Sequence, residues 1–169
     1  MSERYDIVLY GASGFTGVYV LEALAKSAHN DLKFAVAGRS VVESFESHDL
    51  TNTPIIIADS SNENSLAEMA KKAKVIVNVV GPYRLYGEAV VKAAVENGAS
   101  HIDISGEPAF LEKMQMKYSE TTKKNGVYVV GACGWDSITC DLGVNFLKQH
   151  FDGTLDHAET FVSMNTGPS

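Results

Sequence analysis

Cysteine is scarce in this sequence, which contains only Cys133 and Cys140 among its 169 residues. The two cysteines do not form a CxxC motif, and the five histidines are scattered along the chain. The sequence therefore predicts neither a disulfide framework nor a zinc site, and we expect no other metal centre.

Basic residues and long apolar runs are also few. Lysine and arginine number 14 against 21 aspartates and glutamates, and the formal net charge is -7. This balance argues against a nucleic-acid partner, because neutralising phosphate groups requires a basic surface. No stretch approaches the roughly 18 consecutive apolar residues of a transmembrane helix, and the N-terminal apolar run is too short for a signal peptide. These features alone predict an intracellular, cytoplasmic protein.

Short apolar runs recur along most of the chain. They are continuous rather than alternating, which is typical of parallel strands that are covered by helices on both faces. The predicted strands are residues 7–10, 34–37, 55–58, 75–80, 101–104 and 127–130. Parallel strands need long crossover connections between them, and these connections are usually helices.

Helical patterns fill most of the gaps between these runs. The predicted helices cover residues 18–28, 66–73, 90–97, 108–124 and about 137–151. Pro108 marks a helix start, and Gly98 and Gly126 mark helix ends. Between Gly38 and Pro54 the pattern is weak and predicts at most a short helix.

This alternation predicts an α/β fold, a Rossmann-type doubly wound parallel sheet of about six strands with right-handed crossovers. We expect residues 1–150 to form an NAD(P)-binding domain. Residues 154–164 have the pattern of one more strand, which has no visible partner. Residues 151–169 are therefore interpreted as the start of a second domain that this chain does not complete.

A glycine-rich loop follows the first predicted strand. Its spacing is GxxGxxG, in which Gly11 permits a tight turn, Gly14 allows close approach of a diphosphate and Gly17 allows close packing of the helix. Ser13 and Thr16 add hydroxyl groups, and the amides at the helix start favour phosphate. We expect Gly11, Ser13, Gly14, Phe15 and Thr16 to bind a dinucleotide.

The end of the second predicted strand indicates which dinucleotide is bound. An NAD site usually has an acidic residue at this position, to accept a hydrogen bond from the ribose 2'-hydroxyl. This chain has Gly38, Arg39 and Ser40 instead. A carboxylate would repel a 2'-phosphate, whereas Arg39 can pair with one, so we expect NADP as the cofactor in preference to NAD.

Other predicted strand ends add candidates for the same crevice. Asp59 is expected either to bind the adenine amino group or to cap the next helix. Gly81 allows close approach to the cofactor, Pro82 stiffens the turn and Tyr83 is a candidate to cover a ring.

Acid–base and nucleophilic candidates lie at the later strand ends. Asp103, Glu107 and Asp136 are the best-placed carboxylates, but their positions equally fit helix caps and turns, so no catalytic residue is assigned. Cys133 is a candidate thiol nucleophile, but no histidine is spaced recognisably around it.

Five segments together resemble the saccharopine dehydrogenase-like oxidoreductases: residues 5–17, 37–40, 80–88, 102–107 and 134–138. The blocks GPYRLYGE and DISGE are more specific than the glycine loop, and the resemblance spans nearly the whole chain. It implies an N-terminal NADP-binding domain followed by a catalytic domain. It also implies relatives that include enoyl reductases of glycolipid biosynthesis, and animal members at lipid droplets and mitochondria.

Three functions fit these features. The first is an NADP-dependent oxidoreductase, inactive as this fragment alone, that transfers hydride to or from an unknown substrate, which is lipid-related if the resemblance holds. The second is a non-catalytic NADP-binding or scaffold protein, associated with lipid droplets. The third is an acyl-phosphate or semialdehyde dehydrogenase, which would require a histidine partner for Cys133. The substrate and a homo-oligomeric state are left open.

Overall fold

The computed structural model describes residues 3–27, 31–39 and 53–163. The chain divides into two compact units, Met1–Cys133 and Gly134–Ser169. The predicted boundary at residue 150 between the nucleotide-binding domain and a further domain remains a prediction. The short helix expected before Pro54 falls on residues 40–52, and it lies, like Ser40, outside the described residues.

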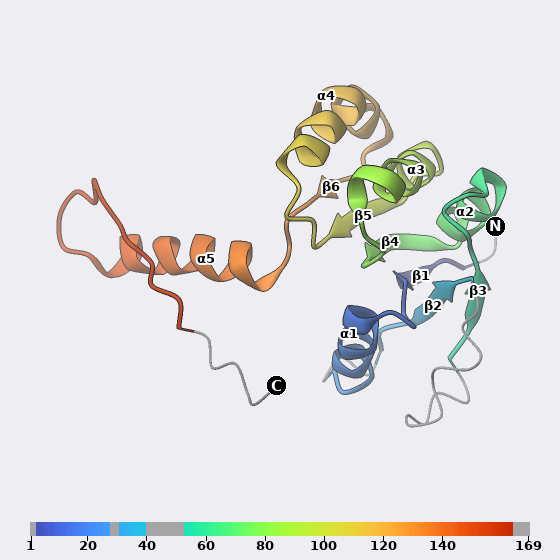
Figure 1. Cartoon of the computed structure of the whole chain (residues 1–169), viewed down its shortest axis with the longest axis horizontal. Coiled ribbons are helices and arrows are strands. Elements are labelled where there is room, and N and C mark those ends of the chain that lie inside the picture. Colours follow the sequence, from blue (N-terminus) through green and yellow to red (C-terminus); the bar gives the residue numbers. More distant parts are fainter. Residues whose placement is uncertain (1–2, 28–30, 40–52, 164–169) are drawn as a thin grey trace. The chain divides into compact units, whose positions relative to one another are not determined.

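Among the described residues of the first unit, strands and helices alternate except that β3 follows β2, as most of the apolar runs predict (Figure 1). The strands are β1 (Tyr5–Tyr10), β2 (Phe34–Gly38), β3 (Ile55–Ile57), β4 (Ala73–Asn78), β5 (Ser100–Asp103) and β6 (Val129–Val130). The helices are α1 (Phe15–Ala25), α2 (Glu63–Lys71), α3 (Tyr83–Glu96) and α4 (Pro108–Asn125).

All six strands form one parallel sheet in the order β3-β2-β1-β4-β5-β6. The chain therefore builds outward from β1 to β3, crosses back over the sheet, and then builds outward again from β4 to β6. This arrangement confirms the predicted Rossmann-type α/β fold. The direction reverses between β1 and β4, and open α/β sheets bind ligands at the carboxyl ends of the strands at such a point.

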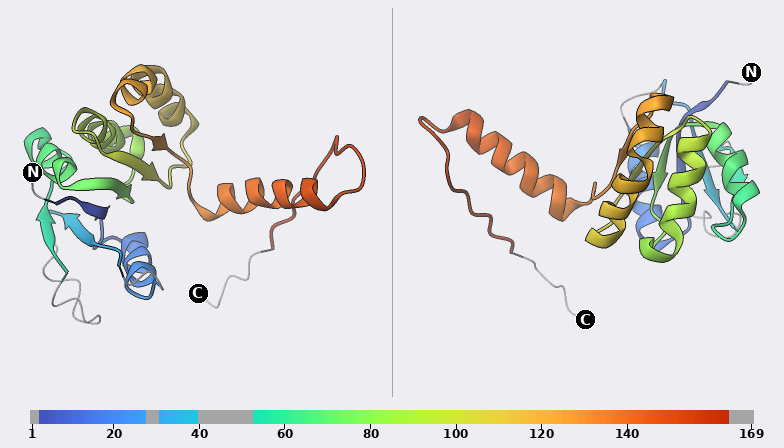
Figure 2. Two further views of the ribbon diagram at one scale, coloured as in Figure 1. Left: turned by 180° about the vertical axis from the view of Figure 1, so that it is seen from behind. Right: turned by 90° about the horizontal axis from the view of Figure 1, so that it is seen from above.

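The described helices are distributed unequally over the two faces of the sheet. The helices α2, α3 and α4 lie side by side over one face, and α1 lies on the other (Figures 1 and 2). Alternate residues of β1 point to opposite faces, as a strand requires. Val8 packs in the cluster that includes Leu66 of α2 and Val90 of α3, whereas Leu9 packs with Leu21 of α1.

The start of α1 lies unusually close to the end of β1. A Cβ atom added at Gly17 would lie 2.1 Å from the carbonyl oxygen of Gly11 and 2.8 Å from the backbone of Ala12. Gly11 itself has a φ of 93°, a conformation that side chains disfavour. Both glycines are therefore required for α1 to begin directly above the carboxyl end of β1.

The second unit contains α5 (Trp135–His150), close to the predicted helix. Its apolar side chains, including Leu142 and Phe146, are exposed. The strand predicted for residues 154–164 is wrong for the part that is described, because residues 154–163 form no strand. An extended segment becomes a strand only when another strand pairs with it. In the described ranges of both units, no helix has the length and apolar character needed to span a membrane.

His101 is a fully buried histidine on β5, where it pairs in register with Ile76 of β4. Its Nε2 atom lies 3.4 Å from the Asn78 Nδ2, and its Nδ1 lies 3.6 Å from an Asp103 carboxylate oxygen. Burial lowers the pKa of His101 to about 4, so the imidazole is neutral at physiological pH. Burial also raises the pKa of Asp103.

We predict that Gly17→Ala strongly destabilises the first unit. The added methyl group would collide with backbone atoms rather than with a side chain that can rotate away. We expect a loss at or above the upper end of the roughly 1–3 kcal/mol that is typical of overpacking. Urea denaturation followed by circular dichroism measures it. Gly106→Ala is the matched control, because nothing lies within 4 Å of a Cβ atom there. Equal stability of the two variants would contradict the packing argument.

We also predict that His101 makes stability depend on pH. Its folded pKa of about 4 lies below the usual histidine pKa of 6.5, so the unfolded chain takes up a proton that the folded chain excludes. Wild-type stability should therefore fall as pH drops from 6.5 towards 4. At about 1.4 kcal/mol per pKa unit, the total is about 3 kcal/mol.

The variant His101→Gln provides the reference for this measurement. Asp103 contributes the opposite slope, but it is present in both proteins, so the difference between their unfolding free energies isolates His101. Urea denaturation at several pH values measures that difference. If the two curves stay parallel across the whole range, His101 does not titrate in this way.

Candidate functional site

A pocket of about 480 Å³ opens at the carboxyl ends of the strands, where the strand order reverses between β1 and β4. The loops after β1, β2, β3 and β4 all contribute to it. Its lining residues are Tyr10, Gly11, Ser13, Gly14, Gly38, Arg39, Asp59, Ser60, Ser61, Val79, Val80, Gly81 and Tyr86.

The N-terminus of α1 borders this pocket and carries no anion of its own. Gly14 is the N-cap residue, it forms no side-chain cap, and no acidic residue occupies the first turn of the helix. The first amides of a helix lack partners within the helix, and the helix dipole places partial positive charge there. This end of the pocket therefore suits a diphosphate, which approaches the backbone closely at Gly14.

The other end of the pocket lies after β2 and β3. Arg39 is exposed directly after β2. The pKa of Asp59 is lowered chiefly by a backbone hydrogen bond from Ser61 and also by the charge of Arg39. Burial raises the pKa of Tyr10, whose hydroxyl group interacts with Ser60. Among the described residues, this end thus combines the cation of Arg39, the carboxylate of Asp59 and several hydroxyl groups.

The structure distinguishes two roles that the sequence left open for Asp59. The α2 cap is Asn62, whose Oδ1 accepts a hydrogen bond from the Ser65 amide at 3.1 Å. Asp59 instead closes a short turn, in which its Oδ1 accepts from the Ser61 amide at 2.9 Å and from the Ser61 hydroxyl at 2.8 Å. Asp59 is therefore not the helix cap, and its role towards adenine stays a prediction.

The loop between β4 and α3 forms a third wall. Gly81 lines the pocket, whereas Pro82 and Tyr83 do not. Tyr83 is buried, and its ring packs against Phe110 of α4. Burial raises the pKa of Tyr83 to about 12, so its hydroxyl keeps its proton and donates to the Asn78 carbonyl at 2.9 Å. Tyr83 is thus unavailable to cover a cofactor ring, and Tyr86 lines the pocket instead.

Most of the predicted cofactor-binding residues come together in this pocket. Those that line it are Gly11, Ser13, Gly14, Gly38, Arg39, Asp59 and Gly81. Phe15 and Thr16 begin α1 but are not among the lining residues. Sequence reasoning missed Tyr10, Ser60, Ser61, Val79, Val80 and Tyr86. All but Tyr86 end a strand or follow one closely, so the strand ends could have indicated them.

Two of the three candidate carboxylates have structural roles in the first unit. Glu107 accepts hydrogen bonds from the amides of Tyr83 and Arg84, at 2.8 Å and 2.9 Å, and so caps α3. Asp103 is buried and accepts from the amides of Ser105 and Ala132, at 2.9 Å and 3.3 Å. Neither carboxylate lines the pocket.

Among the described residues, neither Asp136 nor Cys133 has the neighbours that a catalytic role would need. The Asp136 carboxylate accepts from the Ser137 amide at 3.0 Å, in the first turn of α5. The Cys133 thiol lies 3.6 Å and 3.7 Å from the carbonyl oxygens of Val130 and Gly131. Burial raises the pKa of the Cys133 thiol, and the Asp103 carboxylate adds to this effect. A thiol nucleophile requires the opposite shift.

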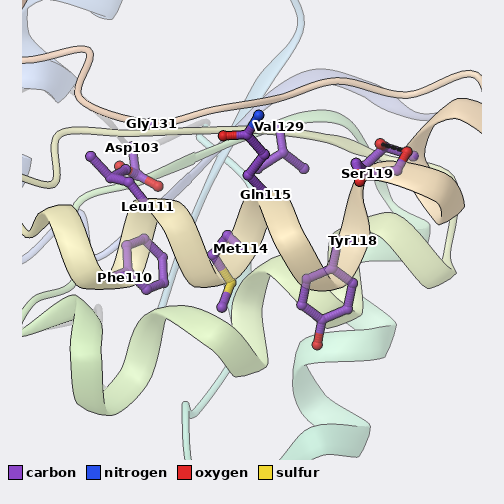
Figure 3. Close-up of a pocket in the computed structure, with 10 residues that line it drawn as sticks. Asp103, Phe110, Leu111, Met114, Gln115, Tyr118, Ser119, Val129 and Gly131 are labelled. Carbon is purple, nitrogen blue, oxygen red and sulfur yellow. Dashed lines mark hydrogen bonds between the residues drawn. The ribbon is translucent and has the colours of Figure 1, made fainter.

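A second hollow, of about 380 Å³, lies along α4 beside β6. Leu111, Gln115 and Ser119 of α4 face Val129 across it, and Asp103 lies at one end near Gly131 (Figure 3). It lacks a glycine loop and a cation, and its charged lining residue is a carboxylate. It does not suit a phosphate, so the pocket beside α1 is the better candidate for a nucleotide.

Comparisons with known proteins agree with this geometry. The family model described as the saccharopine dehydrogenase NADP binding domain matches residues 7–130. The lipid droplet localized protein of Caenorhabditis elegans is 62% identical over 98% of this chain and 41% of its own length. The human saccharopine dehydrogenase-like oxidoreductase is 47% identical over 97% of this chain and 42% of its own length. The chain thus spans about two fifths of these relatives.

A solved structure supports the fold. The saccharopine dehydrogenase (L-Glu forming) of Saccharomyces cerevisiae superposes with a TM-score of 0.68 at 22% identity. The match covers 86% of this chain and 31% of that protein. On the residues that the family model matches and on the two close relatives, the chain belongs to the family of saccharopine dehydrogenase NADP-binding domains.

Proposed function

We propose that the pocket beside α1 holds NADP(H), as the cofactor half of an NADP-dependent oxidoreductase. The diphosphate lies against the α1 N-terminus at Gly14, and the adenosine 2'-phosphate pairs with Arg39. The nicotinamide lies towards the β4–α3 loop at Gly81. The cofactor carries the hydride, and this chain supplies its position and its electrostatic environment.

One observation carries the proposal. The uncapped N-terminus of α1 and the cation Arg39 line the same pocket, at the point where the strand order reverses. A dinucleotide with three phosphate groups needs two separate positive regions, and the pocket offers both. The family membership independently names NADP as the ligand of such domains.

By analogy with the relatives, we propose that the substrate-binding site is formed by residues outside this sequence. Because this chain spans about two fifths of them, we propose that hydride transfer requires residues beyond this sequence. The raised pKa of the Cys133 thiol disfavours the semialdehyde dehydrogenase alternative, because a thiol nucleophile needs a lowered pKa.

A second function has one specific observation in its favour. The Caenorhabditis elegans relative is named as a lipid droplet localized protein rather than as an oxidoreductase. On that ground we propose lipid droplets as the site of action, with a non-catalytic NADP-binding scaffold as the alternative to an enzyme. Oxidation of NADPH by the complete protein in the presence of lipid droplet extract separates the two. A scaffold binds NADPH without consuming it.

We predict that NADPH binds the 169-residue chain more tightly than NADH, and that Arg39→Ala removes most of this preference. A hydrogen bond to a charged group contributes roughly 1.5–3 kcal/mol, so NADPH affinity should fall about ten- to a hundredfold while NADH affinity changes little. Isothermal titration calorimetry measures both affinities.

Lys71→Ala is the control for this experiment. It removes one exposed positive charge that is paired with Glu68 on α2, and Lys71 does not line the pocket. Its NADPH affinity should equal that of the wild type. Equal losses for NADPH and NADH in Arg39→Ala would refute the role of Arg39. If the wild type binds neither nucleotide, the proposed function is wrong.

A further inference from the structure

A ring of polar contacts lies next to the nucleotide pocket and joins the ends of β4 and β5 to the start of α3. The ring has one gap among the described residues, because the buried His101 Nδ1 has no hydrogen-bond partner and only lies near Asp103. Its members are Asn78, Tyr83, His101, Asp103, Ser105 and Glu107. All of them except Glu107 are buried, and none lines the pocket. Buried polar groups usually find hydrogen-bond partners within the protein.

The first half of the ring holds the loop between β4 and α3. The two oxygens of Glu107 accept separately from the amides of Tyr83 and Arg84, at 2.8 Å and 2.9 Å. The Tyr83 hydroxyl reaches back to donate to the Asn78 carbonyl at 2.9 Å. The Asn78 side chain in turn accepts from the Val80 amide at 3.0 Å. The loop is thus held on both sides of Gly81.

The second half of the ring fixes Glu107 itself. The Glu107 amide donates to the Ser105 hydroxyl at 3.1 Å, and the Ser105 amide donates to Asp103 at 2.9 Å. The other Asp103 oxygen lies 3.6 Å from His101, whose far nitrogen lies 3.4 Å from Asn78. The contacts therefore return to the strand end from which the β4–α3 loop begins.

We infer that Glu107 is a positioning residue for NADP(H), acting through the loop of residues 79–82. This inference rests on the proposed function and deepens it. Val79, Val80 and Gly81 form a wall of the pocket, whereas Glu107 does not touch the pocket. Glu107 determines where that wall stands because it holds the two amides that follow it.

The Glu107 carboxylate also favours binding of the cofactor diphosphate at α1 rather than at α3. Its negative charge occupies the N-terminus of α3, which would otherwise present free amides near the pocket. The N-terminus of α1 has no side-chain cap. Of these two helix starts, Glu107 therefore leaves α1 as the one that is open to a diphosphate.

Glu88 supplies a matched control on the same helix. It joins α3 to α4 through ion pairs with Lys113 and Lys117, so its removal costs one negative charge and a connection between two helices. It does not line the nucleotide pocket. A purely structural effect would appear in variants of both glutamates, whereas a positioning effect would appear only at Glu107.

The experiment compares Glu107→Ala, Glu107→Gln and Glu88→Ala in the full 169-residue chain. Calorimetry gives the affinity for NADPH, and hydrogen–deuterium exchange gives the protection of the Tyr83 and Arg84 amides. For Glu107→Ala we expect about a tenfold or greater loss of affinity and faster exchange, since two hydrogen bonds to a charged group are lost. Glu107→Gln keeps one acceptor oxygen and should be intermediate. Glu88→Ala should match the wild type in both measurements.

Each outcome decides between the alternatives. Wild-type NADPH affinity in folded Glu107→Ala overturns the inference, and so does an equal loss in Glu88→Ala. If Glu107→Ala does not fold, Glu107→Gln carries the same comparison. If the wild type binds no NADPH, the proposed function fails by itself. In that case the exchange rates of the Tyr83 and Arg84 amides still test whether Glu107 holds the loop. Unchanged rates in Glu107→Ala would overturn that part of the inference.

Discussion

The close approach of α1 to the end of β1 is the constraint on which the rest of this structure depends. The carbonyl oxygen of Gly11 occupies the space that a side chain at position 17 would need. Only this proximity places the first amides of α1 directly over the carboxyl end of the central strand. The reversal of strand order beside β1 then leaves that position open to a ligand, since the connections from β1 and β4 lead to opposite sides of the sheet.

Sequence patterns predicted the sheet because parallel strands under helices need continuous apolar runs, and β1, β2 and β4 contain them. The glycine loop, Arg39 and Gly81 were predicted for a related reason, since ligand sites in this fold lie at strand ends. The strand expected at residues 154–164 was wrong for its described part, because a local pattern does not supply a pairing partner. Apolar periodicity also does not show where one compact unit ends, because the pattern that predicts α5 does not say which unit the helix packs with.

The sequence also did not predict the directions in which side chains point. Tyr83 and Tyr86 are three positions apart at the start of α3, yet Tyr83 packs into the core against Phe110 and Tyr86 lines the pocket. Strand-end position alone assigned Tyr83 to the ligand. Glu107 and Asp103 were recognised as carboxylates at strand ends, but each also accepts a hydrogen bond from a segment distant in sequence, so their roles depend on the assembled sheet.

One electrostatic rule connects the two helix starts at the carboxyl edge of the sheet. Amides at the start of a helix need an acceptor, and the dipole makes an anion the preferred one. At α3 that anion is the Glu107 carboxylate, which is supplied by the chain itself. At α1 no side chain caps the first turn, and Gly14 leaves room for backbone approach. Because the protein fills one helix start and leaves the other open, a phosphate-bearing ligand has a preferred place at α1. Arg39, at the far end of the same pocket, then favours a ligand that carries a further phosphate.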